Sequence, residues 1–197
     1  MREYEIDHSS FIGGWYIPEK ICDDLIELYQ TSEHLWEDGK ISKYFDGEDR
    51  ATTDEKSKKN TEMYISPSEF MMIPTYLPHL AKCLDEYKKR YPYSDNVNHY
   101  SICTPMKIQY YKPGEGFYKW HMENGGYGQE GKRHLVFMTY LNTLENAGTE
   151  FYHQKITTPC EKGLTIIWPA HWTHTHKGVI NHNSDKHIIT GWYSFND

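Results

Sequence analysis

The second half of the chain is a succession of short runs that are rich in β-branched and aromatic residues. Gly, Pro, Asn and Asp interrupt these runs at intervals of roughly ten residues, which is the pattern of an all-β sandwich or barrel. The runs cover residues 102–111, 133–142, 149–157, 163–169, 172–180 and 186–195. Spacing of this kind predicts an antiparallel double-sheet core, a jelly roll or double-stranded β-helix, over about residues 100–197.

The first half of the chain carries helical patterns. Residues 17–35 have apolar side chains on one helical face and acidic side chains on the other, and Pro18 is suited to open a helix there. The apolar face is formed by Ile21, Leu25 and Leu28. Residues 67–90 predict a second helix, whose start is delayed by Pro74 or Pro78.

These two patterns together predict an α+β fold that is mainly β. A helical buttress of about residues 17–92 is expected to support the jelly-roll core. With 197 residues and no low-complexity linker, the chain is expected to form one domain over residues 1–197.

The segment 38–62 is polar, charged and nearly free of aliphatic side chains. One interpretation is a solvated loop. The other is a mobile lid that folds over a substrate, because long loops in compact domains are often functional.

Bulk properties narrow the function classes. The formal net charge of −7 disfavours binding to a nucleic-acid backbone. No apolar run has the length of a signal peptide or a membrane span, so no membrane partner and a cytoplasmic location are expected. The four cysteines form no CxxC pair and predict free thiols that are buried or half-buried. The sequence does not indicate an oligomeric state.

A set of histidines and one carboxylate indicates a metal site. His121 and Glu123 are two residues apart, so in a strand their side chains would project from one face. A third ligand is available from His171, His174 and His176. Two imidazoles and one carboxylate with open positions form the facial triad of non-haem Fe(II) oxygenases. Each motif alone also fits exposed side chains without a ligand role.

A lysine begins the last β-rich run, ten residues after His176. In such an oxygenase the far carboxylate of 2-oxoglutarate must be neutralised inside the barrel, because a buried carboxylate without a partner is costly. Lys186 is the expected cation, and Tyr111 is expected to add a phenol hydrogen bond to the same carboxylate. Without the histidine, an ordinary lysine at a strand end would be the simpler interpretation.

At these residues the sequence resembles the prolyl 4-hydroxylase-like branch of the 2-oxoglutarate/Fe(II) dioxygenase superfamily. The similarity extends from FIGGWYIPEKICDDLIELY through IQYYKPGEGFYKWHMEN and RHLVFMTYLNTLENAGTEF to KITTPCEKGLTIIWPAHWTHTHKGV and KHIITGWY. The resemblance implies that His121, Glu123 and His176 bind the metal and that Lys186 and Tyr111 bind 2-oxoglutarate. His176 is favoured over His174 by this match and by its spacing to Lys186. Glu123 departs from the usual aspartate and is one methylene longer.

The resemblance further implies Fe(II), 2-oxoglutarate and O₂ as cofactor and co-substrates, with ascorbate as an optional addition. The expected reaction is hydroxylation of a C–H bond, on a prolyl residue in a peptide or protein, with succinate and CO₂ as co-products. A small-molecule or free amino-acid hydroxylase is the first alternative, because variable loops decide the substrate. A non-catalytic, cupin-like metal- or sugar-binding jelly roll is the second. Tyr140 and Trp192 are expected either to wall the pocket or to pack in the core.

Overall fold

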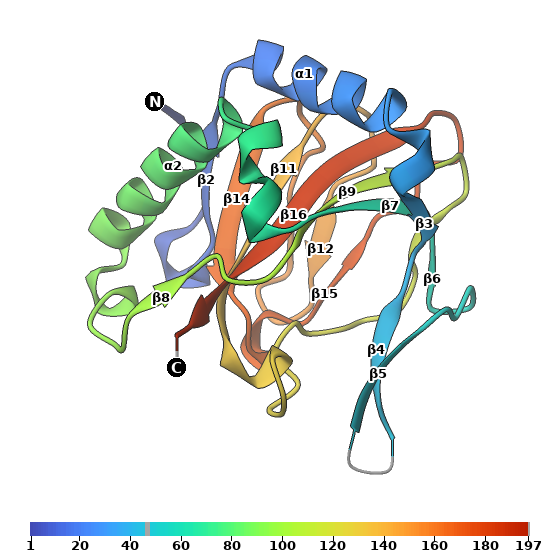
Figure 1. Ribbon diagram of the computed structural model, residues 1–197. Helices are drawn as coiled ribbons and strands as arrows, with labels where there is room; N and C mark the ends of the chain where they lie inside the picture. Colours follow the sequence, from blue (N-terminus) through green and yellow to red (C-terminus); the bar gives the residue numbers. More distant parts are fainter. Residues whose placement is uncertain (46–47, 197) are drawn as a thin grey trace.

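The centre of the molecule is a large antiparallel sheet. The computed structural model describes residues 1–45 and 48–196, and within them this sheet has nine strands in the order β1-β2-β14-β11-β16-β9-β7-β3, with β8 paired to β16 (Figure 1). The strands are β1 (Arg2–Glu3), β2 (Gly13–Tyr16), β3 (Trp36–Asp38), β7 (Thr61–Ile65), β8 (Tyr100–Ser101), β9 (Met106–Tyr111), β11 (Arg133–Tyr140), β14 (Leu164–Pro169) and β16 (Lys186–Phe195).

Shorter strands form the second layer. One small sheet has the order β13-β12-β15, and β15 lies against a two-stranded pair of β10 and β6. These strands are β6 (Lys58–Lys59), β10 (Gly116–Phe117), β12 (Thr149–Phe151), β13 (Ile156–Thr157) and β15 (His176–Gly178). A hairpin of β4 (Ile41–Phe45) and β5 (Glu48–Thr52) projects from the body (Figure 1). The double-stranded β-helix expected from the sequence is therefore confirmed.

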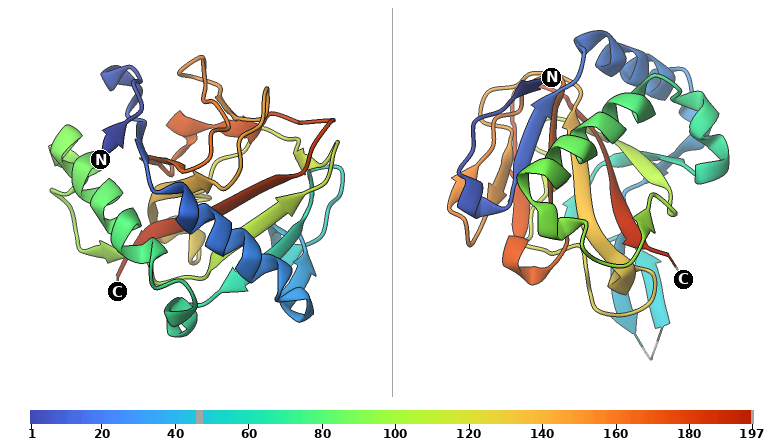
Figure 2. Two further views of the ribbon diagram at one scale, coloured as in Figure 1. Left: turned by 90° about the horizontal axis from the view of Figure 1, so that it is seen from above. Right: turned by 90° about the vertical axis from the view of Figure 1, so that its left-hand side faces the viewer.

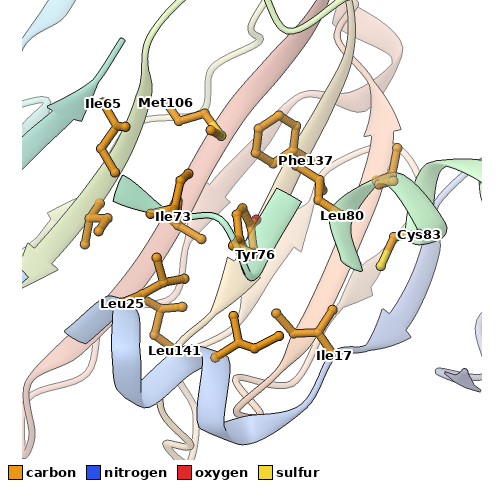
Figure 3. Packing of buried hydrophobic residues seen from close by; sticks show 14 of the residues in the cluster. Ile17, Leu25, Ile65, Ile73, Tyr76, Leu80, Cys83, Met106, Phe137 and Leu141 are labelled. Atoms are coloured by element: carbon orange, nitrogen blue, oxygen red, sulfur yellow. The ribbon is translucent and has the colours of Figure 1, made fainter. Parts of the chain in front are cut away.

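Two helices cover the face of the large sheet that lies opposite the small sheets (Figure 2). They are α1 (Glu19–Gln30) and α2 (Tyr76–Arg90). The described residues also form short 3₁₀ segments, which are η1 (His8–Ser10), η2 (Glu33–Leu35), η3 (Pro67–Met72), η4 (Pro92–Ser94), η5 (Glu130–Lys132) and η6 (Trp172–His174). Apolar side chains from both helices pack onto the sheet in one buried cluster, as Figure 3 shows for Leu25, Tyr76 and Phe137. No helix among the described residues is long and apolar enough to cross a membrane.

The predicted helices form with shifted bounds. The first is shorter than the expected range 17–35, and Pro18 is its N-cap. The second begins at Tyr76, so Pro74 delays its start and Pro78 lies in its first turn. Residues 67–72, which belonged to the predicted helix, form the 3₁₀ segment η3 instead.

The predicted β-rich runs also form strands, with one exception. The run 172–180 contains both η6 and β15, and the predicted core ends at Asp197, which lies outside the described residues. Three of the four free cysteines are buried, whereas Cys103 is exposed and so differs from the expectation for buried or half-buried thiols.

The prediction of a solvated loop over residues 38–62 is wrong for most of the segment. Its described residues form the β4–β5 hairpin, β6 and the start of β7, while residues 46–47 lie outside the described part of the chain. The side chains of Lys58 and Glu62 are only 4% and 0% exposed because they form an ion pair with each other. Charged residues therefore enter the interior here by mutual pairing. A closing motion of this segment over substrate stays a prediction.

Candidate active site

A short backbone contact brings together two segments that are distant in sequence. His121 and His176 form an isolated antiparallel bridge, with N–H···O distances of 3.0 and 2.9 Å in the two directions. Two residues later, the Glu123 N–H donates to the carbonyl of Ala170 at 3.1 Å. The segment around His121 and Glu123 is otherwise irregular, so the expectation that both lie on a regular strand is wrong. Instead, the backbone bridge to His176 in β15 positions His121 and Glu123.

The three side chains converge on one point. Oε1 of Glu123 lies 3.5 Å from Nε2 of His121 and 3.5 Å from Nε2 of His176. One potential ligand atom from each residue lies within 4.8 Å of the others. Ligand bonds of about 2.0–2.2 Å to a central ion require donor atoms about 3 Å apart, so small adjustments suffice to hold one ion. This donor set fits the two-histidine, one-carboxylate triad of ferrous oxygenases.

Backbone carbonyls fix the orientation of both imidazoles. Nδ1 of His121 lies 3.0 Å from the carbonyl of Lys119, and Nδ1 of His176 lies 2.8 Å from the carbonyl of His174. Each Nδ1 therefore carries a proton, and each Nε2 is left as the free lone pair that a metal needs. The ring of Phe117 stacks on His121 with 3.5 Å between centroids. Burial, with the neighbouring His176, lowers the pKa of His121 and favours its neutral ligand form.

The other oxygen of Glu123 is held from outside the triad. Oε2 accepts a hydrogen bond from Nε1 of Trp192 at 3.0 Å and from Nη1 of Arg133 at 3.4 Å. Burial tends to raise the pKa of Glu123, but contacts with His121 and His176 and the charge of Arg133 outweigh burial. The pKa of this carboxyl is held well below its ordinary value, so Glu123 is ionised.

The neighbouring histidines are placed differently from His176. His174 and His176 would share one face if they lay in a single strand, but His174 ends η6 and His176 begins β15. Nε2 of His174 lies 2.9 Å from the carbonyl of Ser10 and its Nδ1 lies 3.0 Å from Oγ1 of Thr173, so both ring nitrogens are engaged. Burial lowers the pKa of His174 to about 4. His171 is exposed at the N-cap of η6.

The predicted cation and phenol face each other on two neighbouring strands. Lys186 on β16 is directly opposite Tyr111 on β9. The buried Lys186 ammonium donates to the carbonyl of Ala147 and lies 3.4 Å from the carbonyl of Gly148. Within the described parts of the chain, no carboxylate forms an ion pair with it, and burial lowers its pKa. The Tyr111 hydroxyl donates to Oε1 of Gln109.

One cavity of about 490 Å³ joins the triad to these two residues. It lies between the large sheet and the small sheets and is lined by His121, Glu123, His176, Lys186 and Tyr111. Trp192 also lines the cavity, which agrees with its expected role as a pocket wall. Tyr140 is instead fully buried, and its hydroxyl lies 2.7 Å from those of Thr149 and Thr158, so it packs in the core.

Two of the charged residues that line the cavity were not identified from the sequence. Lys107 and Arg133 line it beside Trp192, with Arg133 stacked 3.8 Å above the indole ring. Lys107 shares a strand face with Gln109 and Tyr111, so alternation from Tyr111 along β9 is the signal that identifies it. Arg133 begins β11 and carries no comparable signal.

Comparison with protein families gives one match. The family model described as the 2OG-Fe(II) oxygenase superfamily matches residues 106–194, which contain the triad, Lys186 and Tyr111. No curated protein sequence matches the chain.

Solved structures share the fold at low identity. A viral collagen prolyl hydroxylase from Paramecium bursaria Chlorella virus-1 matches with a TM-score of 0.65 and 16% identity, over 94% of this chain and 97% of that one. A Pseudomonas putida prolyl-4-hydroxylase matches with a TM-score of 0.65 and 12% identity, over 94% and 93%. A Trichoplax adhaerens prolyl hydroxylase in complex with a hypoxia inducible factor peptide fragment matches with a TM-score of 0.70 and 15% identity, over 94% and 84%.

Proposed function

We propose that the chain is a 2OG-Fe(II) oxygenase, because the model of that superfamily matches residues 106–194, and that it hydroxylates an unactivated C–H bond of a prolyl residue in a peptide or protein. That assignment implies Fe(II), 2-oxoglutarate and O₂, and the proposed co-products are succinate and CO₂. The observation that carries this proposal is a single cavity that holds a two-histidine, one-carboxylate cluster and a buried lysine without an acidic partner among the described residues.

In the proposed site, Nε2 of His121, Nε2 of His176 and Oε1 of Glu123 hold the iron. The bound iron supplies open coordination positions at which 2-oxoglutarate and O₂ react. A carboxylate among the ligands favours hydroxylation, because a halogenating site needs a small residue there to leave room for halide. The protein orients the reactants and excludes water from the cavity.

Lys186 and Tyr111 are proposed to bind the far carboxylate of 2-oxoglutarate. The hydrogen-bond partners of the Lys186 ammonium among the described residues are only backbone carbonyls, so a dicarboxylate would supply the missing negative charge. Tyr111 would turn its hydroxyl from Gln109 to that carboxylate. A binding-only jelly roll, the cupin-like alternative, has no use for such a cation deep in its cavity.

A prolyl substrate is supported by the solved structures that share this fold. The three compared above are prolyl hydroxylases by name, and one of them holds a peptide fragment. A free amino acid or another small molecule remains the alternative. A single catalytic domain, a cytoplasmic location and ascorbate as an optional addition belong to the same proposal.

The iron and 2-oxoglutarate roles are tested without any substrate. Anaerobic addition of Fe(II) and 2-oxoglutarate should produce the visible charge-transfer band of the chelate. Lys186→Ala should weaken 2-oxoglutarate binding by about 100-fold, since a buried charge pair is lost. Lys162→Ala is the matched control, because Lys162 pairs with Asp23 at the surface. Absence of the band in the wild type would remove the oxygenase assignment.

The substrate class requires turnover. Succinate release should be measured with proline-containing peptides and, in parallel, with free amino acids, and the product mass should increase by one oxygen. Peptide-dependent succinate is the expected result. Coupled turnover with small molecules alone would replace the prolyl-peptide assignment by the free amino-acid alternative.

A further inference from the structure

A second lysine of the cavity has no role in the site described so far. Lys107 lies on β9, and its side chain is 17% exposed on the cavity wall. The ammonium lies 5.0 Å from the centroid of the Tyr64 ring and 5.5 Å from that of the Trp192 ring. Two aromatic rings therefore position this cation at the cavity surface.

The carboxylate that forms an ion pair with Lys107 is already occupied. Nζ of Lys107 lies 3.5 Å from Oε2 of Glu62, and no hydrogen bond between these two groups is formed. Oε1 of Glu62 accepts from Lys58, and Oε2 accepts from the Tyr64 hydroxyl at 2.8 Å. One carboxylate thus serves two ammonium groups.

This arrangement leaves an excess of positive charge and of donors. A lysine ammonium has three N–H donors, and within the described residues none of those of Lys107 has a hydrogen-bond acceptor. A partly desolvated cation that lacks an acceptor costs free energy in the folded protein, and Lys107 is such a half-buried cation. The cavity is the direction from which the missing acceptor can come.

The position of Lys107 separates it from the proposed 2-oxoglutarate site. In the pairing of β9 with β16, Tyr111 is opposite Lys186 and Lys107 is opposite Thr190. The two lysines are therefore four residues apart along the strands, which is about 13 Å at 3.3 Å per residue. Lys107 instead neighbours Trp192, whose indole donates to Glu123. It is at the end of the cavity where substrate would meet the metal.

We propose that Lys107 binds a carboxylate of the substrate and so selects an anionic substrate. This inference rests on the proposed function and names the chemistry of its substrate. A carboxylate can come from the free α-carboxylate of an amino acid or C-terminal residue, or from an acidic side chain next to the reacting residue. In either case it supplies the acceptors that Glu62 does not.

Matched pairs of ligands test this without turnover. The Zn(II)- and 2-oxoglutarate-loaded protein is titrated by calorimetry with N-acetylproline and N-acetylprolinamide, and with acetyl-Pro-Glu-amide and acetyl-Pro-Gln-amide. In at least one pair the carboxylate should bind about tenfold more tightly than its amide, the strength of a charge-assisted hydrogen bond. The first pair reports a free carboxylate and the second an acidic side chain.

Lys107→Met should abolish that preference, and Lys107→Gln should do the same with a polar side chain. Lys40→Met is the matched control, because Lys40 also lines the cavity but pairs with Glu37 outside the site. Equal affinity for both members of both pairs in the wild type would overturn the proposal, even if a variant did not fold. So would a preference that persists in Lys107→Met. The Fe(II)–2-oxoglutarate band is measured in Lys107→Met as well. If the band forms but the carboxylate preference is absent, the role of Lys107 is wrong and the oxygenase assignment still holds.

Discussion

The two faces of strands β9 and β16 differ sharply although they alternate along the same residues. The face toward the helices carries apolar side chains such as Ile108, Ile189 and Tyr193, which belong to the main buried cluster. The face toward the cavity carries Lys186, Lys107, Gln109, Tyr111, Thr190 and Trp192. Strand alternation separates these two sets at every step.

The difference shows that the helix-facing side of these strands stabilises the fold, whereas the cavity-facing side carries the candidate active site. Close packing against the helices stabilises the sheet, since buried apolar surface is the main favourable term in folding. The cavity face instead retains cations that lack full partners, which lowers stability in the absence of ligands. A substitution should therefore affect folding or chemistry according to the face it alters.

The largest effect is expected at the metal cluster. His176→Ala should remove one of three ligands, abolish stoichiometric metal binding and lower turnover by about 10³-fold or more. His174→Gln is the control, because both nitrogens of His174 already contact protein atoms. It should lower stability and keep metal binding, as measured by calorimetric titration with Mn(II). If His174→Gln lost the metal and His176→Ala retained it, His174 and not His176 would be the metal ligand.

On the helix face, Phe137→Ala should destabilise the fold by about 3–5 kcal/mol, the range for a large buried aromatic. Phe137 is fully buried and fills the space above Gly191, where an added Cβ would clash with its ring. Urea unfolding measures the loss. The folded fraction should still form the Fe(II)–2-oxoglutarate band. Loss of the band at full folding would show that the two faces are not independent.

A smaller effect of opposite sign is expected at Lys186. Lys186→Met should raise the free energy of unfolding by about 1–3 kcal/mol, because it removes a buried charge, while 2-oxoglutarate binding is lost. Burial lowers the pKa of Lys186 in the folded state, so the unfolded chain binds more protons between that pKa and the ordinary lysine value. Wild-type stability therefore rises with pH in this window.

The gain from Lys186→Met should accordingly shrink as the pH approaches the ordinary lysine value. Urea midpoints of both proteins at several pH values without ligand measure this. Lys162→Met, at a surface ion pair, should show no such trend. A destabilised Lys186→Met protein would indicate that the carbonyls of Ala147 and Gly148 fully satisfy the ammonium.

Much of the fold was predictable because its signals are local. The runs that became β9, β11, β14 and β16 combine β-branched residues with regular turn signals. Strands β6 and β7 were missed because Lys58 and Glu62 are charged in the sequence but buried as a pair. Hydropathy cannot detect burial that depends on a partner.

At the candidate site, residue types and spacing identified the converging side chains, whereas their local structure was misjudged. His121 is placed by its bridge to His176, a contact between distant segments, and not by a regular strand. His174 and His176 lie in different elements because η6 ends at His174, and no residue pattern in this run marks that end. Arg133 and Trp192 meet Glu123 from two further strands, and no sequence spacing encodes that meeting.

The hydrogen bonds from Trp192 and Arg133 to Oε2 of Glu123 limit how many oxygens of this carboxylate can bind a metal ion. An oxygen that accepts from an indole and a guanidinium has little lone-pair density left for an ion, so the glutamate would ligate through Oε1 alone. Three protein donor atoms, rather than four, would then hold the iron and would leave more of its positions open to co-substrates.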